Sequence, residues 1–236
     1  DLLLKEVQER IVAVLRMAEA LSPKYHVVVA NPPYMGAKSM DSALSEFARA
    51  QYPDSRFDLF AMFMERALSV SRKHATVGMV NMQGWMFASS LEGLRSKLLS
   101  NASITTMAHI GTRGFDTISG EVVSTTAFTL LSGGRRDLQG IYLRLVDGRS
   151  EAEKASLAKS AISNGTNKYS FSIADIEKIP GQPIAYWLSE AMTSAFRVGA
   201  PVSETMGLKA GLSTGDNTIF QRQWHEVALS SSCLPF

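Results

Sequence analysis

Short runs of β-branched and other apolar residues alternate with helical segments along the first 150 residues, and this alternation limits the fold more than any other feature. The run at 25–30 is apolar on both faces, which is typical of a central parallel strand. It follows a helix predicted over 3–21, where apolar residues recur every three or four positions. Further strands are predicted over residues 76–81, 104–110, 121–131 and 141–146.

Helices are predicted between these strands. Residues 58–70 are apolar on nearly every side, which indicates a buried helix. Ser89 and Glu92 have the spacing of a capping box and predict that another helix begins there. Helices and strands alternating in this way predict an α/β sheet domain over residues 1–150. A second region, residues 151–236, opens with a charged, alanine-rich helix and then loses any strong periodicity.

Composition excludes several kinds of protein. Cys233 is the only cysteine, so there is no disulfide framework and no cysteine-based zinc site, and the four histidines are too scattered to indicate a metal centre. No apolar run approaches the roughly 18 residues of a membrane span, and a cytoplasmic protein is expected. The net charge of +2 permits a nucleic-acid partner without requiring one. Because the chain starts at Asp1 without a methionine, we expect a fragment of a longer protein.

The sequence Asn31-Pro32-Pro33-Tyr34 directly after the first strand is the feature that carries chemistry. Two prolines stiffen the backbone, which can then hold the Asn31 side-chain oxygen and the Pro32 carbonyl as two fixed acceptors. Such a pair suits an exocyclic amine with two N–H donors, and it stabilises positive charge that develops on the nitrogen. Tyr34 can stack on the flat ring that carries the amine. The alternative is a strand-ending turn with Tyr34 as packing.

Four segments resemble the motifs of S-adenosylmethionine-dependent DNA adenine methyltransferases that act on the amino group. Residues 27–36 look like their motif IV, residues 57–63 like motif V, residues 77–85 like motif VI and residues 109–123 like motif VIII. The likeness is greatest to the large phage-defence methyltransferases of the BREX type and to restriction–modification methyltransferases. It implies the C-terminal half of a Rossmann-like class I methyltransferase sheet, with helices on both faces.

The resemblance implies roles for individual residues. Asn31 and Pro32 would accept the hydrogens of the adenine amine, and Tyr34 would stack on the flipped base. Phe115 would contact the other side of that base. Base flipping is expected because the amine cannot meet the cofactor inside a duplex.

The resemblance also implies a cofactor site, which this chain carries only in part. Leu59 and Phe63 match positions near the adenine of S-adenosylmethionine, with core packing as the alternative for both, as for Phe115. The family's aromatic-x-Gly-x-Gly cofactor loop should precede Asn31, but no such loop occurs in this chain. The fragment is therefore expected to be inactive alone.

Basic residues are spread through the predicted loops. Lys38, beside the Asn31 turn, and Arg113, close to Phe115, are the best candidates for contacts with DNA phosphates, although a solvated surface is the ordinary role of such residues. Tyr186-Trp187 and the segment 211–227 look like the linker into a target-recognition region, with His225 where a tyrosine is more usual.

The predicted function is methylation of the adenine amine in double-stranded DNA, in restriction–modification or phage defence, where other subunits could take part. Two alternatives stay open. Methyltransferases that act on a glutamine amide of a protein share the Asn-Pro-Pro-Tyr arrangement but are short and lack a long C-terminal region. A non-catalytic DNA-binding piece is the other alternative, because the cofactor loop is missing.

Overall fold

The computed structural model describes residues 2–116, 123–177, 179–200, 204 and 206. Residues 1–197 form one compact unit and residues 198–236 a second. The helices of the first unit and its border are α1 (Leu2–Leu21), α2 (Ser42–Gln51), α3 (Leu59–Val70), α4 (Glu92–Asn101), α5 (Glu151–Asn164), α6 (Ile173–Ile176) and α7 (Glu190–Val198). The strands are β1 (Tyr25–Ala30), β2 (Ser71–Met82), β3 (Ala102–Gly111), β4 (Thr125–Ser132), β5 (Gly140–Arg144) and β6 (Lys168–Phe171).

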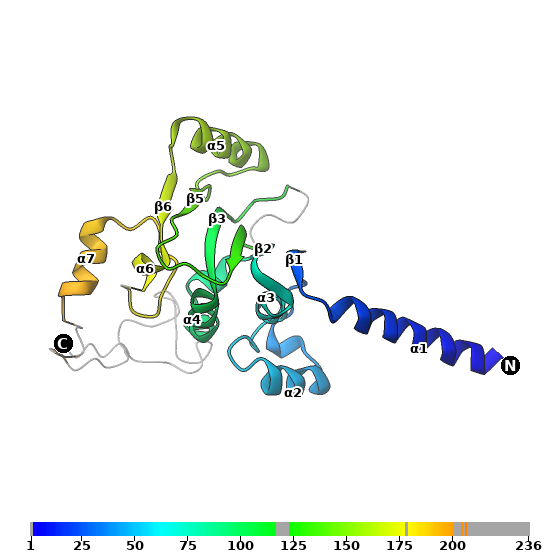
Figure 1. The fold of residues 1–236 in the computed structure, drawn as a ribbon. Coiled ribbons are helices and arrows are strands. Elements are labelled where there is room, and N and C mark those ends of the chain that lie inside the picture. Colours follow the sequence, from blue (N-terminus) through cyan, green and yellow to red (C-terminus); the bar gives the residue numbers. More distant parts are fainter. Residues whose placement is uncertain (1, 117–122, 178, 201–203, 205, 207–236) are drawn as a thin grey trace, which may run out of the picture. The chain divides into compact units, whose positions relative to one another are not determined.

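The strands form a single mixed sheet in the order β1-β2-β4-β3-β5-β6 (Figure 1). β1 pairs with β2 in parallel and β3 pairs with β5 in parallel, whereas β4 and β6 run antiparallel to their neighbours. The strands β1, β2, β3 and β5 therefore all point the same way. Their carboxyl ends share one edge of the sheet, which is where open α/β sheets bind ligands.

The α/β class predicted from the sequence is confirmed, and β1 is parallel as expected. Its predicted central place is wrong for this sheet, because β1 lies at one end of the strand order. Val27 and Val29 are 62% and 79% exposed, so one face of β1 is uncovered among the described residues. The apolar composition of a strand does not by itself distinguish an edge from a centre.

Helices α3 and α4 pack on one face of the sheet (Figure 1). Alternate strand residues, including Val77, Met79 and Phe128, point into that layer and are buried. The opposite face is less covered: of the described helices, α5 borders it through Ile162. Helices were expected on both faces of the sheet. Among the described residues, α3 and α4 cover one face, and α5 borders the other.

Several elements differ from the sequence-based expectation. Ser89 opens a short 3-10 turn, and α4 begins at Glu92 without a side-chain cap, so the predicted capping box is not formed. α2 is a helix that the sequence patterns did not predict, and its N-terminus is capped by Asp41. β6 pairs with β5, so the sheet continues beyond residue 150. The division into a domain over residues 1–150 and a second region over residues 151–236 stays a prediction.

A buried arginine ties α4 to the chain on either side of it. Arg95 is only 2% exposed. Its guanidinium donates to the carbonyl oxygens of Ala88 at 2.6 Å, Trp85 at 3.2 Å and Gly181 at 2.8 Å. Because these carbonyls come from two distant segments, the arginine holds the segment after α6 against the loop after β2.

Substituting methionine for Arg95 removes the donor for all three carbonyls. We expect the free energy of unfolding to fall by about 3 kcal/mol, since each buried acceptor left unsatisfied costs about 1–3 kcal/mol. Urea denaturation measures the change, with Arg66→Met on the exposed side of α3 as the matched control. Equal losses in the two variants would contradict a structural role for Arg95.

Candidate active site at the carboxyl edge of the sheet

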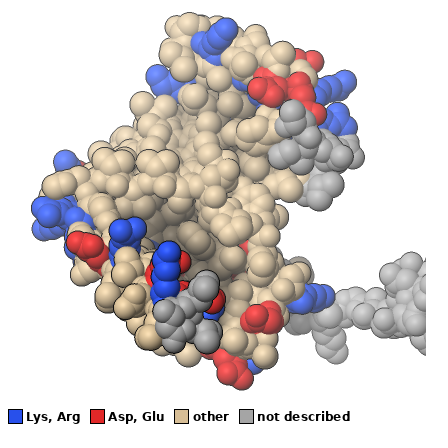
Figure 2. Space-filling model, turned by 90° about the vertical axis from the view of Figure 1, so that its right-hand side faces the viewer, with Lys and Arg blue, Asp and Glu red and all other residues tan. Residues whose placement is uncertain are grey.

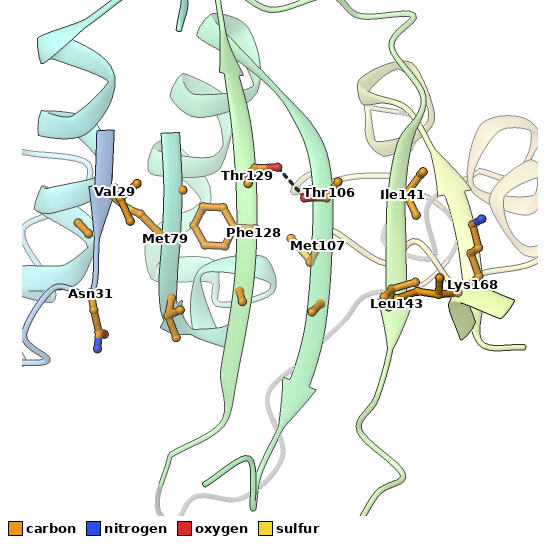
Figure 3. A pocket seen from close by; sticks show the side chains of 16 residues that line it. Val29, Asn31, Met79, Thr106, Met107, Phe128, Thr129, Ile141, Leu143 and Lys168 are labelled. Atoms are coloured by element: carbon orange, nitrogen blue, oxygen red, sulfur yellow. Dashed lines mark hydrogen bonds between the residues drawn. The ribbon is translucent and has the colours of Figure 1, made fainter. Parts of the chain in front are cut away.

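The Asn31-Pro32-Pro33-Tyr34 turn leaves β1 at the carboxyl edge. In Figure 3 the Asn31 side chain extends beyond the end of the strand. Asn31 is exposed and Pro32 is buried. No hydrogen bond to the Asn31 side chain is found among the described residues, so its amide oxygen is available as an acceptor. The structure thus gives the turn an exposed side-chain acceptor, and the pairing of this acceptor with the Pro32 carbonyl on an amine stays a prediction.

The chain after this turn is fastened to the start of α3. The Asp58 carboxylate accepts the Met35 N–H at 3.0 Å and caps α3 by accepting the Phe60 N–H at 3.3 Å. Gly36 and Asp58 form an isolated antiparallel bridge, flanked by the bond from Leu59 N–H to the Met35 carbonyl at 3.0 Å. Two segments predicted as separate motifs are therefore one hydrogen-bonded unit.

The Tyr34 ring is held by contacts on the buried side of the turn. It meets the ring of Phe60 edge to face, with centroids 5.9 Å apart, and its hydroxyl lies 3.5 Å from the Val80 carbonyl. Burial and the neighbouring Asp58 carboxylate raise the pKa of the Tyr34 hydroxyl. The ring is still 37% exposed, which leaves surface for a stacking partner.

His109, a buried residue near the end of β3, contacts the segment after β2 and the segment that contains Tyr186. Gln83 Oε1 lies 2.8 Å from His109 Nε2, and Tyr186 Oη lies 3.0 Å from His109 Nδ1. Because the amide oxygen only accepts, Nε2 carries the proton, and the neutral ring then accepts the Tyr186 O–H at Nδ1. Burial, helped by Arg144 and Lys154, lowers the pKa of His109 to about 4, so the ring is neutral at physiological pH.

Sequence reasoning missed this contact. His109 and Tyr186 are 77 positions apart, and no local pattern connects them. Tyr186 stacks on Tyr142 at 4.7 Å, and Trp187 packs against Phe87 at 5.6 Å. The segment predicted as a linker is thus part of the core beneath the site.

The other predicted site residues lie around the turn without meeting in one cluster. Leu59 is half-buried, and Phe63, one turn later on α3, is 39% exposed. Lys38 and Arg113 are exposed. Phe115 is 41% exposed in the loop after β3, which lies three strand spacings from β1, about 14 Å at the level of the sheet. The segment 211–227 lies outside the described residues.

A cavity of about 620 Å³ lies over the less covered face of the sheet. Figure 3 shows Val29 and Asn31 on its β1 side and Leu143 and Lys168 on the far side. The face of the molecule in Figure 2 is hollowed at its centre, where uncharged residues gather, and both signs of charge lie mixed at its margin. The described residues of this face therefore form no continuous basic stripe.

Within the described part of the chain, no three His, Cys, Asp or Glu side chains gather closely enough to hold a metal ion. None of the described helices combines the length and apolar character needed to cross a bilayer.

Comparison with known sequences gives consistent matches. Residues 5–115 match the profile of the family described as Eco57I restriction-modification methylase. The chain is 41% identical over 232 residues to the adenine-specific methyltransferase BrxX of Escherichia coli O9:H4 (strain HS), covering 98% of this chain and 19% of that protein. It is 39% identical over 216 residues to the adenine-specific methyltransferase PglX of Lacticaseibacillus casei (strain Zhang), covering 90% and 18%. The chain spans about a fifth of the length of these curated relatives.

Comparison with solved structures shows the fold alone. The DrdV–DNA complex, solved by cryo-electron microscopy, matches with a TM-score of 0.52 and 13% identity, over 75% of this chain and 20% of that chain. A structure from a type I restriction–modification system matches with a TM-score of 0.50 and 14% identity, over 79% and 42%.

The Asp58 bonds generate a structural prediction. Asp58→Ala removes the acceptor for the Met35 and Phe60 amides and should lower the free energy of unfolding by about 1–2 kcal/mol. Amide exchange at Met35 should become faster, as measured by hydrogen–deuterium exchange. Asp58→Asn keeps a side-chain oxygen and should preserve most of the protection; unchanged exchange in Asp58→Ala would contradict the role of this carboxylate.

His109 generates a pH prediction. Its folded pKa of about 4 lies below the ordinary value of 6.5, so between these values the unfolded chain binds more protons. The contribution of His109 to the free energy of unfolding should be fully present above pH 6.5. The free energy of unfolding should fall by up to about 3 kcal/mol as the pH drops to 4. Urea denaturation across this range should show a weaker pH dependence for His109→Gln, whereas His26→Gln, an exposed control, should behave as the wild type. Identical slopes in all three proteins would refute the assignment.

Proposed function

Because residues 5–115 belong to the Eco57I restriction-modification methylase family, we propose that this chain forms part of an enzyme that methylates the exocyclic amine of adenine in double-stranded DNA. The methyl donor would be S-adenosylmethionine. The observation that carries the proposal is the exposed Asn31 amide on a stiff, anchored turn at the carboxyl edge, with an exposed Tyr34 ring beside it.

The proposed mechanism follows from the donors of the adenine amine. The base leaves the duplex and lies against Tyr34, which supplies a stacking surface. The Asn31 oxygen and the Pro32 carbonyl accept the two amine hydrogens, which directs the nitrogen lone pair away from them. The nitrogen would become positive as it takes the methyl group released by the donor sulfur, and the same two acceptors would stabilise that charge until a proton leaves to water. No titratable side chain is needed to start the transfer.

Leu59 and Phe63 suit the adenine end of S-adenosylmethionine. S-adenosylmethionine supplies a methyl group on a positively charged sulfur. Leu59 and Phe63 stand one turn apart on α3 with apolar surface exposed, which suits the flat adenine ring of that molecule. They would hold this ring close to the Asn31 turn.

The remaining site residues would serve the DNA. Phe115 would contact the flipped base from the side opposite Tyr34, which requires the loop after β3 to reach across the edge of the sheet. Lys38 and Arg113 would contact phosphates. Restriction–modification or phage defence in the cytoplasm, together with other subunits, is the proposed setting, since both curated relatives are adenine-specific methyltransferases.

Substitutions at the turn test the proposal in the complete protein that includes this chain. Asn31→Ala should lower kcat for DNA methylation about 10²–10³-fold, as loss of a preorganised charge-stabilising group does elsewhere. Tyr34→Ala should lose much of the activity through lost stacking, and Tyr34→Phe should keep most of it because the ring remains. Transfer of labelled methyl groups to DNA and to protein is measured side by side, with thermal unfolding as the control for folding.

Two outcomes would overturn the proposal. One is full activity of both Asn31→Ala and Tyr34→Ala on DNA. The other is a wild-type protein that methylates a protein amide instead of DNA.

A further inference from the structure

A smaller cavity is lined in part by the segment that follows the Asn31 turn. It has a volume of about 320 Å³ and is lined by five residues: Ala37, Ser45, Arg49, Arg56 and Phe57. Two of the five are arginines and one is a hydroxyl-bearing serine. A concave site with two guanidinium groups and a hydroxyl has the donors that a phosphate requires.

The local structure brings these donors together. Ser45 and Arg49 are four positions apart on α2, so both side chains lie on one face of the helix. Arg56 comes from the loop after α2, and its guanidinium lies over the Phe57 ring, 5.1 Å from the ring centre. The ring contact holds this flexible side chain at the cavity without using up its N–H donors.

The nearby carboxylates do not neutralise the arginines. No ion pair to Arg49 or Arg56 is found among the described residues. Asp41 accepts the Leu44 N–H at 2.8 Å as the cap of α2, and Asp58 accepts the Met35 and Phe60 amides. Glu46 on α2 and Asp54 before Arg56 are also close in the chain, and neither forms an ion pair with the two arginines in the part of the chain that the structure describes, so the cavity keeps two positive charges.

The cavity is connected to the turn that holds Asn31. Ala37, in the wall of the cavity, donates its N–H to the Phe57 carbonyl at 2.9 Å. Ala37 follows Tyr34 by only three residues. A ligand bound by the arginines would therefore lie on the chain segment that continues from the turn, and Lys38, the next residue, adds a further exposed cation.

We propose that Arg49, Arg56 and Ser45 bind a phosphate of the DNA backbone close to the extruded adenine. This rests on the proposed function, which brings DNA to the turn. The planar guanidinium forks suit the tetrahedral oxygens of a phosphate. The contact fixes the backbone where the nucleotide rotates out of the duplex, and it carries no sequence information.

The salt dependence of DNA binding tests the proposal. The complete protein is titrated with a short duplex that carries the sequence at which it methylates adenine, and log Kd is plotted against log salt. Each phosphate contact contributes about 0.9 to the slope. The double variant Arg49→Gln/Arg56→Gln should lower the slope by about 0.9, because one phosphate contact is lost, and each single variant should lower it by no more than that. Arg56→Lys should keep the wild-type slope because it keeps the charge.

Arg66→Gln is the matched control, since Arg66 is exposed on α3 away from the cavity and should leave the slope unchanged. Thermal unfolding of each variant, and its stabilisation by inorganic phosphate alone, are measured in parallel. An unchanged slope in the double variant overturns the proposal, and the function stands if that protein still methylates DNA. An unchanged slope together with lost stabilisation by phosphate would mean that the cavity takes free phosphate, which also overturns it. A wild-type protein that neither binds nor methylates DNA would refute the proposed function itself.

Discussion

The Asp58 carboxylate is the contact on which the site geometry depends. It accepts the Met35 N–H after the turn and the Phe60 N–H in the first turn of α3. One oxygen thus joins the end of a strand to the beginning of a buried helix. Phe60, fixed in this way, supports the Tyr34 ring from the side. The position of the exposed Asn31 acceptor is therefore set by the Asp58 hydrogen bonds and the Phe60 contact of the neighbouring Tyr34, and not by contacts of the Asn31 side chain itself.

The direction of the strands then sets what gathers around the turn. Because β1, β2 and β3 are mutually parallel, Asn31, Gln83 and the end of β3 leave the sheet at the same edge. His109 links the β2 and β3 exits through Gln83 and reaches the segment that contains Tyr186. The chain beyond residue 150 therefore contributes to the shape of the edge, although it is distant in sequence from the turn.

The sequence predicted local features better than contacts across the fold. The helix at 58–70 and the strand at 25–30 were found because apolar residues repeat at helical or strand spacing. α2 was missed because half of its residues are polar and only Ala48 is buried, while its beginning depends on the Asp41 cap. The edge position of β1 was missed because the apolar composition of a strand specifies neither its place in the strand order nor whether both of its faces are covered. The Asn31 turn was found because two prolines and an asparagine leave few alternatives, whereas the His109–Tyr186 bond leaves no trace in either local sequence.

The distribution of charge around the turn fits the chemistry proposed for it. The groups that would receive the amine hydrogens, the Asn31 amide and the Pro32 carbonyl, are neutral. A cation there would oppose the positive charge that develops on the nitrogen. Arg49 and Arg56 belong instead to α2 and the loop after it, and their cavity touches the turn's continuation at Ala37. Binding of a phosphate can therefore be strongly electrostatic, while the acceptors that hold the amine remain uncharged.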